Sequence, residues 1–241
     1  SNGLLIRGST VRARLGPLYF LDTLLPMSLI RMDLHLSLDG LMSAGQSEAA
    51  PMGDDWGKLT KSYVSTKTFQ SRVMGDTSGK GTTGIDDKYA AAYFENIGAE
   101  IMGASMFGFT SHPDDADWKG WWGDTPPFGY PVFVMTHRAP REALVMDGGT
   151  IFHFRSGDLA PVIAEAKEAA SGKDIRISGG SGLAKAALEA GVVDRLHLNI
   201  SPVVLGQGIS FGENLRELES SYEISSEISE SGSIHVTFTR R

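Results

Sequence analysis

The sequence contains no cysteine among its 241 residues. This absence excludes disulfide bonds, thiolate nucleophiles, iron–sulfur clusters and cysteine-based zinc sites. No apolar run approaches the roughly eighteen residues that a membrane span requires. Positive charge is not in excess either, because the net charge is −7, and this does not favour a nucleic acid or an acidic membrane as a partner. We therefore expect a cytoplasmic protein that binds neither nucleic acid nor membrane.

Several catalytic motifs are also missing. No GxSxG elbow occurs, which disfavours a serine hydrolase. The histidines never fall at the helical i, i+4 spacing of metal ligands, so we expect no metal site; they are His35, His112, His137, His153, His197 and His235. The run from Ser78 to Gly84 is rich in glycine but lacks the spacing and the preceding strand of a phosphate loop, so it predicts a surface loop.

The composition fits a globular protein with one substantial core. Hydrophobic residues make up 41% of the chain and charged residues 21%, both ordinary for such proteins. Residues 1–26 match a signal peptide poorly, and we interpret them as an extension outside the fold. Because no repeat or linker divides the rest, we expect a single domain over residues 27–241.

The order of hydrophobic patterns predicts a fold of the α/β class. Alternating or continuous apolar runs predict strands at 28–38, 100–102, 131–136, 150–154, 175–177 and 195–205. Helical patterns predict helices at 59–74, 88–99, 159–170 and 183–188, with Asp86 and Asp87 capping the second. Residues 222–239 alternate on both sides of a Ser-Gly-Ser turn and predict a β-hairpin. The expected architecture is a mostly parallel central sheet with helices on both faces, completed by a C-terminal antiparallel hairpin.

The segment from Asp174 to Gly191 carries the clearest ligand signal. A short strand breaks at Gly179-Gly180-Ser181-Gly182 and resumes as a helix from Leu183. Glycines let a backbone approach a phosphate closely, and the first helical N–H groups favour an anion. A tight turn without any ligand explains this segment equally well. The rest of the chain has to decide between the two.

Companion breaks fall at the ends of other predicted strands. Gly103 begins a second junction of strand, glycine and helix, and Thr136-His137-Arg138 follow the strand at 131–136. Ligands in such sheets bind at the carboxyl ends of strands. Two glycine turns near a Thr-His-Arg run suggest a cradle for dinucleotide phosphates, with Arg138 suited to the 2′-phosphate of NADP; alone, Arg138 would be a surface ion pair. The usual Rossmann fingerprint fails, because Lys185 replaces its third glycine.

The loop at 111–131 carries Trp118, Trp121 and Trp122. These side chains could form a lid over a site or a plug that packs on the core. We favour packing, since large aromatic side chains are mostly buried.

Together these segments resemble a known family. The carriers are Ser37-Leu38-Asp39-Gly40, Ile101-Met102-Gly103, Val134-Met135-Thr136, Ile177-Ser178-Gly179-Gly180, Asp194 to Leu198, and Pro202 to Gly208. In this order they are similar to the reductase (C-terminal) domain family of bifunctional riboflavin-biosynthesis deaminase–reductases, which has the dihydrofolate-reductase-like fold. The resemblance runs from about Met27 to the C-terminus.

The resemblance implies an NADPH-dependent reductase, often a homodimer, that delivers hydride to a C=N group or an opened ribosyl carbon of a small-molecule substrate. The cofactor-binding positions that it implies are Ser37, Gly103, Ala104, Ser105, Thr136, His137, Arg138, Ser178, Gly179, Gly180, Ser181, Gly182 and Leu183. Leu38, Gly40 and Met42 would lie beside the substrate. Relatives often carry arginine where this chain has Ala104, which leaves more of the phosphate charge to Arg138. The deaminase half, with its zinc signature, is not found in this sequence.

Two acids are candidates for catalysis. We predict that Asp39 and Asp87 orient the substrate or supply a proton, although Asp87 as a simple helix cap needs no substrate. A folate-type reductase would carry an acid on the helix before the Gly103 strand, where Asp87 lies, so dihydrofolate reductase is an alternative. A catalytically silent nucleotide-binding paralogue is another.

Overall fold

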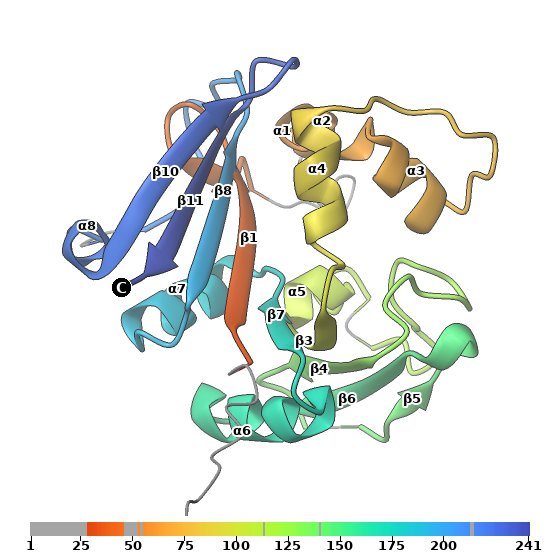
Figure 1. Ribbon diagram of the computed structural model, residues 1–241. Coiled ribbons are helices and arrows are strands. Elements are labelled where there is room, and N and C mark those ends of the chain that lie inside the picture. The colour runs from red at the N-terminus through yellow and green to blue at the C-terminus, as the bar shows by residue number, and fades with distance from the viewer. Residues whose placement is uncertain (1–27, 46–52, 54, 113, 140, 213–214) are drawn as a thin grey trace, which may run out of the picture.

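A computed structural model of the chain describes residues 28–45, 53, 55–112, 114–139, 141–212 and 215–241 (Figure 1). The predicted extension at 1–26 lies outside these residues. Nine strands form one sheet in the order β10-β11-β8-β1-β7-β3-β4-β6-β5. A second, two-stranded sheet pairs β2 with β9.

The centre of the large sheet is parallel, as predicted. Its parallel strands are β1 (Ile30–Leu36), β3 (Ile97–Gly103), β4 (Pro131–Met135), β6 (Ile151–Arg155), β7 (Asp174–Ile177) and β8 (Arg195–Ile200). Antiparallel strands close both sides: β11 (Ile234–Arg240) and β10 (Tyr222–Ile228) form the predicted hairpin, and β5 (Leu144–Val145) lies at the opposite side. The small sheet consists of β2 (Leu41–Ser43) and β9 (Ile209–Ser210).

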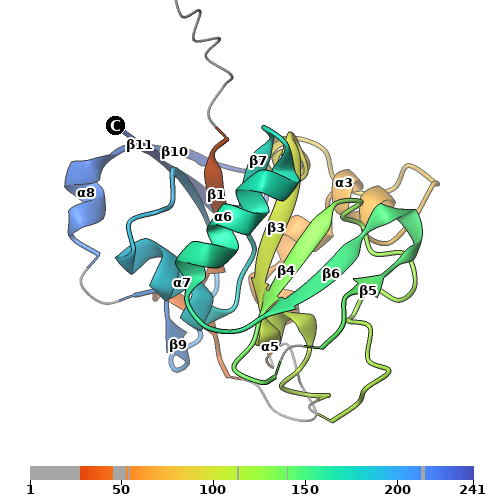
Figure 2. The ribbon, with the colours of Figure 1, turned by 90° about the horizontal axis from the view of Figure 1, so that it is seen from below.

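Helices cover both faces of the large sheet (Figures 1 and 2). On one face α6 (Leu159–Ala170) and α7 (Ser181–Glu189) pack against apolar residues of β1, β3, β7 and β8. On the other face α4 (Ile85–Ala92) lies over the same strands, with α1 (Trp56–Leu59), α2 (Lys61–Val64) and α3 (Lys67–Arg72) beside it. The remaining helical segments are α5 (Ala104–Phe107), α8 (Glu217–Ser221) and the 3₁₀ turn η1 (Asp147–Gly149).

Two apolar clusters form the core. The larger one joins α6 and α7 to the sheet and contains fully buried side chains such as Met32, Ile101 and Ile177. The smaller one gathers Phe107 of α5, Val132 and Val134 of β4, and Phe152 and Phe154 of β6. Trp118 and Trp122 of the 111–131 loop pack against this second cluster, and the Trp118 indole donates to the Phe107 carbonyl at 2.8 Å. The prediction that this loop packs on the core is therefore confirmed.

Several predicted boundaries were wrong. The helix predicted at 88–99 ends at Ala92, since the chain turns at Asn96 with a positive φ of 56° and enters β3 at Ile97. Gly84 is its N-cap residue, whereas Asp86 and Asp87 lie in its first turn. The strand predicted to continue to residue 205 ends at Ile200, before a proline that has no N–H for the ladder.

The helix predicted at 59–74 is divided into three short pieces, α1 to α3. The strand β5, the small sheet and α8 were not predicted. Among the described residues, no helix is long and apolar enough to cross a membrane.

Gly98, the second residue of β3, offers a test of how closely the start of this strand packs on the end of α6. A Cβ atom at Gly98 would lie 2.5 Å from the Ala170 carbonyl oxygen and 2.8 Å from the Ala170 Cα. Because neighbouring backbone cannot yield easily, Gly98→Ala should lower the free energy of unfolding by about 1–3 kcal/mol. Urea denaturation measures this change. Gly57→Ala is the matched control, since a Cβ at Gly57 of α1 meets nothing within 4 Å, and an equal loss in both variants would contradict the prediction.

Candidate functional site

The two predicted glycine turns meet at the carboxyl edge of the sheet. The Gly103 N–H donates to the Gly179 carbonyl at 3.0 Å. A Cβ atom at Gly103 would lie 3.3 Å from the Gly180 Cα, and one at Gly180 would lie 3.2 Å from the Gly103 Cα. Gly179 and Gly180 also have positive φ values of 108° and 88°, a conformation that favours glycine. The two turns therefore form one backbone junction in which a side chain on either glycine would be tightly packed.

The α7 helix begins directly at this junction. Gly180 is its N-cap and supplies no side-chain hydrogen bond, so no cap from this residue covers the first amides of the helix, those of Ser181, Gly182 and Leu183. Ala104 and Ser105 begin α5 immediately after Gly103. Helix N-termini of this kind attract anions because the amides and the helix dipole both favour negative charge. Ser178, the last residue before the glycines, is buried, and its N–H donates to the Ile101 carbonyl at 3.1 Å.

Thr136, His137 and Arg138 follow the neighbouring strand. Gly103 is in register with Met135 of β4, so the Thr-His-Arg run begins one strand away from the glycine junction. The Thr136 N–H donates to the Arg155 carbonyl at 2.8 Å, and the Thr136 hydroxyl accepts the Arg138 N–H at 3.1 Å. The Arg138 guanidinium lies at the surface, 3.4 Å from the Asp114 carboxylate. The structure thus brings this run to the same edge as the glycines.

The turn after β1 is closed by its own side chains. The Leu41 N–H donates to the Ser37 hydroxyl at 3.0 Å. The Asp39 carboxylate accepts the N–H groups of Leu205 and Gly206, at 3.1 and 2.7 Å. The Ser37 hydroxyl and then these two amides lower the pKa of Asp39 to about 2. An acid that stays ionised and ties two loops together suits orientation of a substrate better than proton supply.

Leu38, Gly40 and Met42 surround this turn. Leu38 is exposed, while its N–H donates to the Val203 carbonyl at 2.8 Å. Gly40 has a positive φ of 77°, and Met42 packs partly against the larger core cluster. These predicted substrate positions therefore lie together, between β1 and the loop that follows β8.

Asp87 lies in the first turn of α4 and is half-buried. Its carboxylate accepts the Thr68 N–H at 2.8 Å, near the N-terminus of α3. It therefore caps a neighbouring helix, and one of its oxygens is used in doing so. Its role as a proton donor stays a prediction. The acid that the fold buries is its neighbour Asp86, which contacts His235.

Sequence reasoning missed a buried layer of charge between α4 and the sheet. The Arg176 guanidinium contacts the Asp33 carboxylate at 3.2 Å and the Glu100 carboxylate at 3.8 Å, and the Tyr130 hydroxyl donates to Glu100 at 3.0 Å. Burial alone would raise the pKa of Asp33, but a hydrogen bond with His197 and the charge of Arg176 lower it to about 2. Burial raises the pKa of Glu100, and Arg176 opposes that rise.

One signal in the sequence could have revealed this layer. In β1 the charged or polar residues Arg31, Asp33 and His35 alternate with apolar ones. Such alternation normally indicates one solvent-facing side. Here β1 is the fourth strand of nine and both of its faces are covered, so its polar residues had to pair with those of neighbouring strands.

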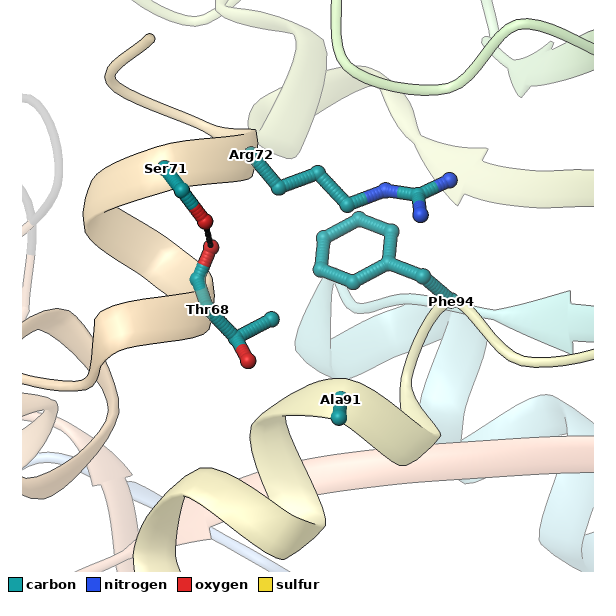
Figure 3. Close-up of a pocket in the computed structure, with 5 residues that line it drawn as sticks. All are labelled: Thr68, Ser71, Arg72, Ala91 and Phe94. Atoms are coloured by element: carbon teal, nitrogen blue, oxygen red, sulfur yellow. Dashed lines mark hydrogen bonds between the residues drawn. The ribbon is translucent and has the colours of Figure 1, made fainter. Parts of the chain in front are cut away.

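Two recesses lie near the amino ends of β3 and β4, at the other edge of the sheet. One, of about 420 Å³, is lined by Thr68, Ser71, Arg72, Ala91 and Phe94, and the Arg72 guanidinium lies over the Phe94 ring (Figure 3). The second, of about 410 Å³, shares Arg72 and Phe94 and extends to Gly98 and Tyr130. Since these reach the amino ends of β3 and β4, they do not coincide with the glycine junction. We place the candidate site at the junction on the geometry of its backbone.

The sheet order, the helices on both faces and the C-terminal hairpin define a dihydrofolate-reductase-like α/β protein with its candidate site at the carboxyl edge. The family model described as the RibD C-terminal domain matches residues 28–229. The chain therefore belongs to the RibD C-terminal domain family, as the sequence resemblance predicted. No curated protein sequence matches the chain.

The chain is similar to several solved structures, of which the first supports the fold. A provisionally assigned riboflavin biosynthesis protein from Shewanella sp. PV-4 has a TM-score of 0.54 and 20% identity, and the alignment covers 89% of this chain and 99% of that one. A dihydrofolate reductase from Enterococcus faecalis, in complex with NADP(H) and RAB-propyl, has a TM-score of 0.47 and 11% identity, with 88% and 96% covered. A deaminase/reductase from Thermotoga maritima has a TM-score of 0.46 and 12% identity, and 89% of this chain covers 57% of it.

Removing Arg176 should be costly, because its charge compensates two buried carboxylates. Arg176→Met leaves Asp33 and Glu100 buried without their common partner, and should lower the free energy of unfolding by about 3–5 kcal/mol. Chemical denaturation at pH 7 measures the loss. As a control, Arg155→Met removes an ion pair with Glu165 in which about a third of each side chain is exposed, so it should cost at most about 1 kcal/mol. A loss of that size for Arg176→Met would contradict a stabilising role for the buried guanidinium.

Proposed function

We propose that the protein is an NADPH-dependent reductase that transfers hydride to a small heterocyclic or phosphoribosylamine substrate, in the manner of a 5-amino-6-(5-phosphoribosylamino)uracil reductase. The observation that carries this proposal is the junction of Gly103 with Gly179 and Gly180 at the carboxyl edge of the sheet, in a chain of the RibD C-terminal domain family. Glycines without side chains, directly at the N-terminus of α7, let a pyrophosphate approach the backbone closely.

Different residues at this edge would bind different parts of the cofactor. The first amides of α7, from Ser181 to Leu183, would bind the pyrophosphate. Thr136, His137 and Arg138 would lie by the adenosine ribose, where the guanidinium suits a 2′-phosphate. Because Ala104 offers no charge, Arg138 supplies the cation in this arrangement.

NADPH supplies the hydride when bound, and the protein contributes binding, orientation and electrostatics. The turn from Ser37 to Met42 would lie beside the nicotinamide and the substrate. Asp39, held by two amides of the loop after β8, would accept hydrogen bonds from substrate N–H or O–H groups. Asp87 is the second candidate for orientation or proton supply.

Cytoplasmic location and a homodimer belong to the same proposal. The absence of cysteine supports an intracellular protein without proving it. The outer strand β10 exposes Ile224 and Ile228, an apolar edge that a second copy of the chain could cover. Sedimentation of the purified protein distinguishes monomer from dimer.

Binding and turnover test the proposed function in one series. NADPH fluorescence quenching measures binding, and absorbance loss at the nicotinamide band measures turnover of the phosphoribosylaminopyrimidine or of dihydrofolate. Turnover of the former alone supports the proposal, and turnover of dihydrofolate alone would make the protein a dihydrofolate reductase. Binding without turnover would indicate a silent paralogue, and absence of NADPH binding would overturn both reductase assignments.

Arg138 should decide between the two nicotinamide cofactors. Arg138→Gln removes the charge proposed for the 2′-phosphate, so the affinity for NADPH should fall about tenfold or more while that for NADH stays unchanged, since a charge-assisted hydrogen bond is worth about 1.5–3 kcal/mol. Fluorescence titration with both cofactors measures the ratio. Lys119→Gln is the control, because Lys119 also forms an exposed ion pair in the same region, with Asp124. Equal losses for NADPH and NADH would contradict the assignment of Arg138.

A further inference from the structure

The helix α4 is joined to the sheet by a chain of hydrogen bonds through two histidines. Asp86 Oδ1 lies 2.9 Å from His235 Nε2, and His235 Nδ1 lies 3.0 Å from His197 Nε2. His197 Nδ1 then lies 3.4 Å from the Tyr93 hydroxyl. Asp86 and Tyr93 belong to α4 and its C-cap, while the histidines belong to β11 and β8. The chain thus leaves α4 near its start and returns to it at its end.

The two imidazole rings are buried and stack against the ring of Tyr89. Their side chains are 3% and 1% exposed. The Tyr89 ring lies parallel to His197 at 4.3 Å and to His235 at 4.2 Å, with interplanar angles of 6° and 5°. A proton that enters or leaves either ring therefore requires α4 to move away.

The positions of the protons at the His235 end of this chain follow from the geometry. The His235 Nε2–H donates to the Asp86 carboxylate, because the opposite tautomer would place a nitrogen lone pair against that carboxylate. His235 Nδ1 is then an acceptor, so His197 donates to it from Nε2. His197 Nδ1 lies 3.4 Å from the Tyr93 hydroxyl and 3.5 Å from the Asp33 carboxylate.

The gap between the two rings holds one proton and no more. A proton on His235 Nδ1 would point at the His197 Nε2–H across 3.0 Å. Two N–H groups cannot share that gap, so protonation of His235 separates the two rings.

The groups around the two rings also act on the pKa of His235. Around His235 the titratable neighbours are Asp86 and Tyr89 of α4, His197 of β8 and Glu227 of β10. Around His197 they are Asp33 and His35 of β1, Arg176 of β7, Tyr89 and Tyr93 of α4 and His235 of β11. Burial lowers the pKa of His235, with the Asp86 hydrogen bond opposing this and the charge of His197 adding to it.

We propose that Asp86, His235, His197 and Tyr93 form a pH-sensitive latch, here called the histidine latch, which holds α4 on the sheet and releases it on acidification. The first turn of α4 lies at the same end of the sheet as the hairpin tip, since the Ile85 N–H donates to the Glu230 carboxylate. A Cβ at Gly232 of that tip would lie 3.9 Å from Pro202, just after β8. The start of α4 therefore lies near the carboxyl end of β8.

Proton linkage gives the direction in which release of α4 depends on pH. A histidine whose pKa is lowered in the docked state binds more protons when α4 is released, where the pKa returns to about 6.5. The latch is therefore intact above that pH and weakens as pH falls below it. The release equilibrium should grow up to about tenfold for each pH unit below 6.5.

Hydrogen exchange of the whole protein measures this release. Between pH 7.5 and 5.5, protection factors of the α4 amides from Tyr89 to Ala92, corrected for intrinsic exchange, should fall about tenfold. Those of α6, which packs on β3, β4 and β7, should fall less. Equal falls in α4 and α6 would indicate global unfolding and would overturn the proposal, as would α4 protection that does not change with pH.

Variants separate the latch from other histidines. His235→Gln keeps an amide that can bond Asp86 and His197 but does not titrate, so α4 should lose its pH dependence. Exposed His137→Gln should keep it. His35→Gln should keep it too, although burial lowers the pKa of His35 to about 3 and this third buried histidine adds to global acid sensitivity. Loss of the α4 effect in His35→Gln, with its persistence in His235→Gln, would assign the response to His35 and overturn the proposal.

Nitrogen chemical shifts can be measured on the unmodified protein, so this test does not depend on whether a variant folds. At pH 8 His235 should show the Nε2–H tautomer, and a Nδ1–H tautomer of His235 would overturn the proposal. None of these measurements involves NADPH, so they stand or fall separately from the proposed function.

Discussion

The guanidinium of Arg176 sets the character of one whole face of the sheet. It lies on β7, in the middle of the parallel strands, within reach of carboxylates on β1 and β3. Moving a charge out of water costs several kcal/mol, which only well-placed partners offset. Once this cation is buried, the neighbouring positions on that face have to supply acids and hydrogen-bond partners rather than methyl groups. The position of α4 follows, since its tyrosines cover this polar layer.

The opposite face of the same strands is apolar. Met32, Ile101 and Ile177 pack there under α6 and α7 and stabilise the fold through burial of apolar area. Apolar packing tolerates some repacking, whereas a hydrogen-bonded layer loses a partner all at once. The apolar face therefore holds the sheet to its helices, while the polar face specifies how α4 is placed.

Much of the fold could be predicted from the sequence, because strands and helices such as α6 have clear periodicity and clear ends. The glycine junction was readable for a related reason: Gly103 and Gly180 need no partner to be recognised, only a strand before and a helix after. The polar layer was not readable. Asp33, Arg176 and His197 lie far apart in the chain, and alternation alone cannot show whether a polar side is solvated or covered. Asp86 and Asp87 show the same limit at close range, since only packing decides which of two adjacent acids is buried.

The candidate site and the polar layer share an edge, and this links their behaviour. At the glycine junction two backbones pack directly against each other. The start of α4 is held instead by Asp86, by the Glu230 contact and by the Asp87 cap on α3, all of which are polar and individually reversible. Close backbone packing therefore fixes one part of this edge, whereas hydrogen bonds set the position of the other, and a change in protonation can act only on the second.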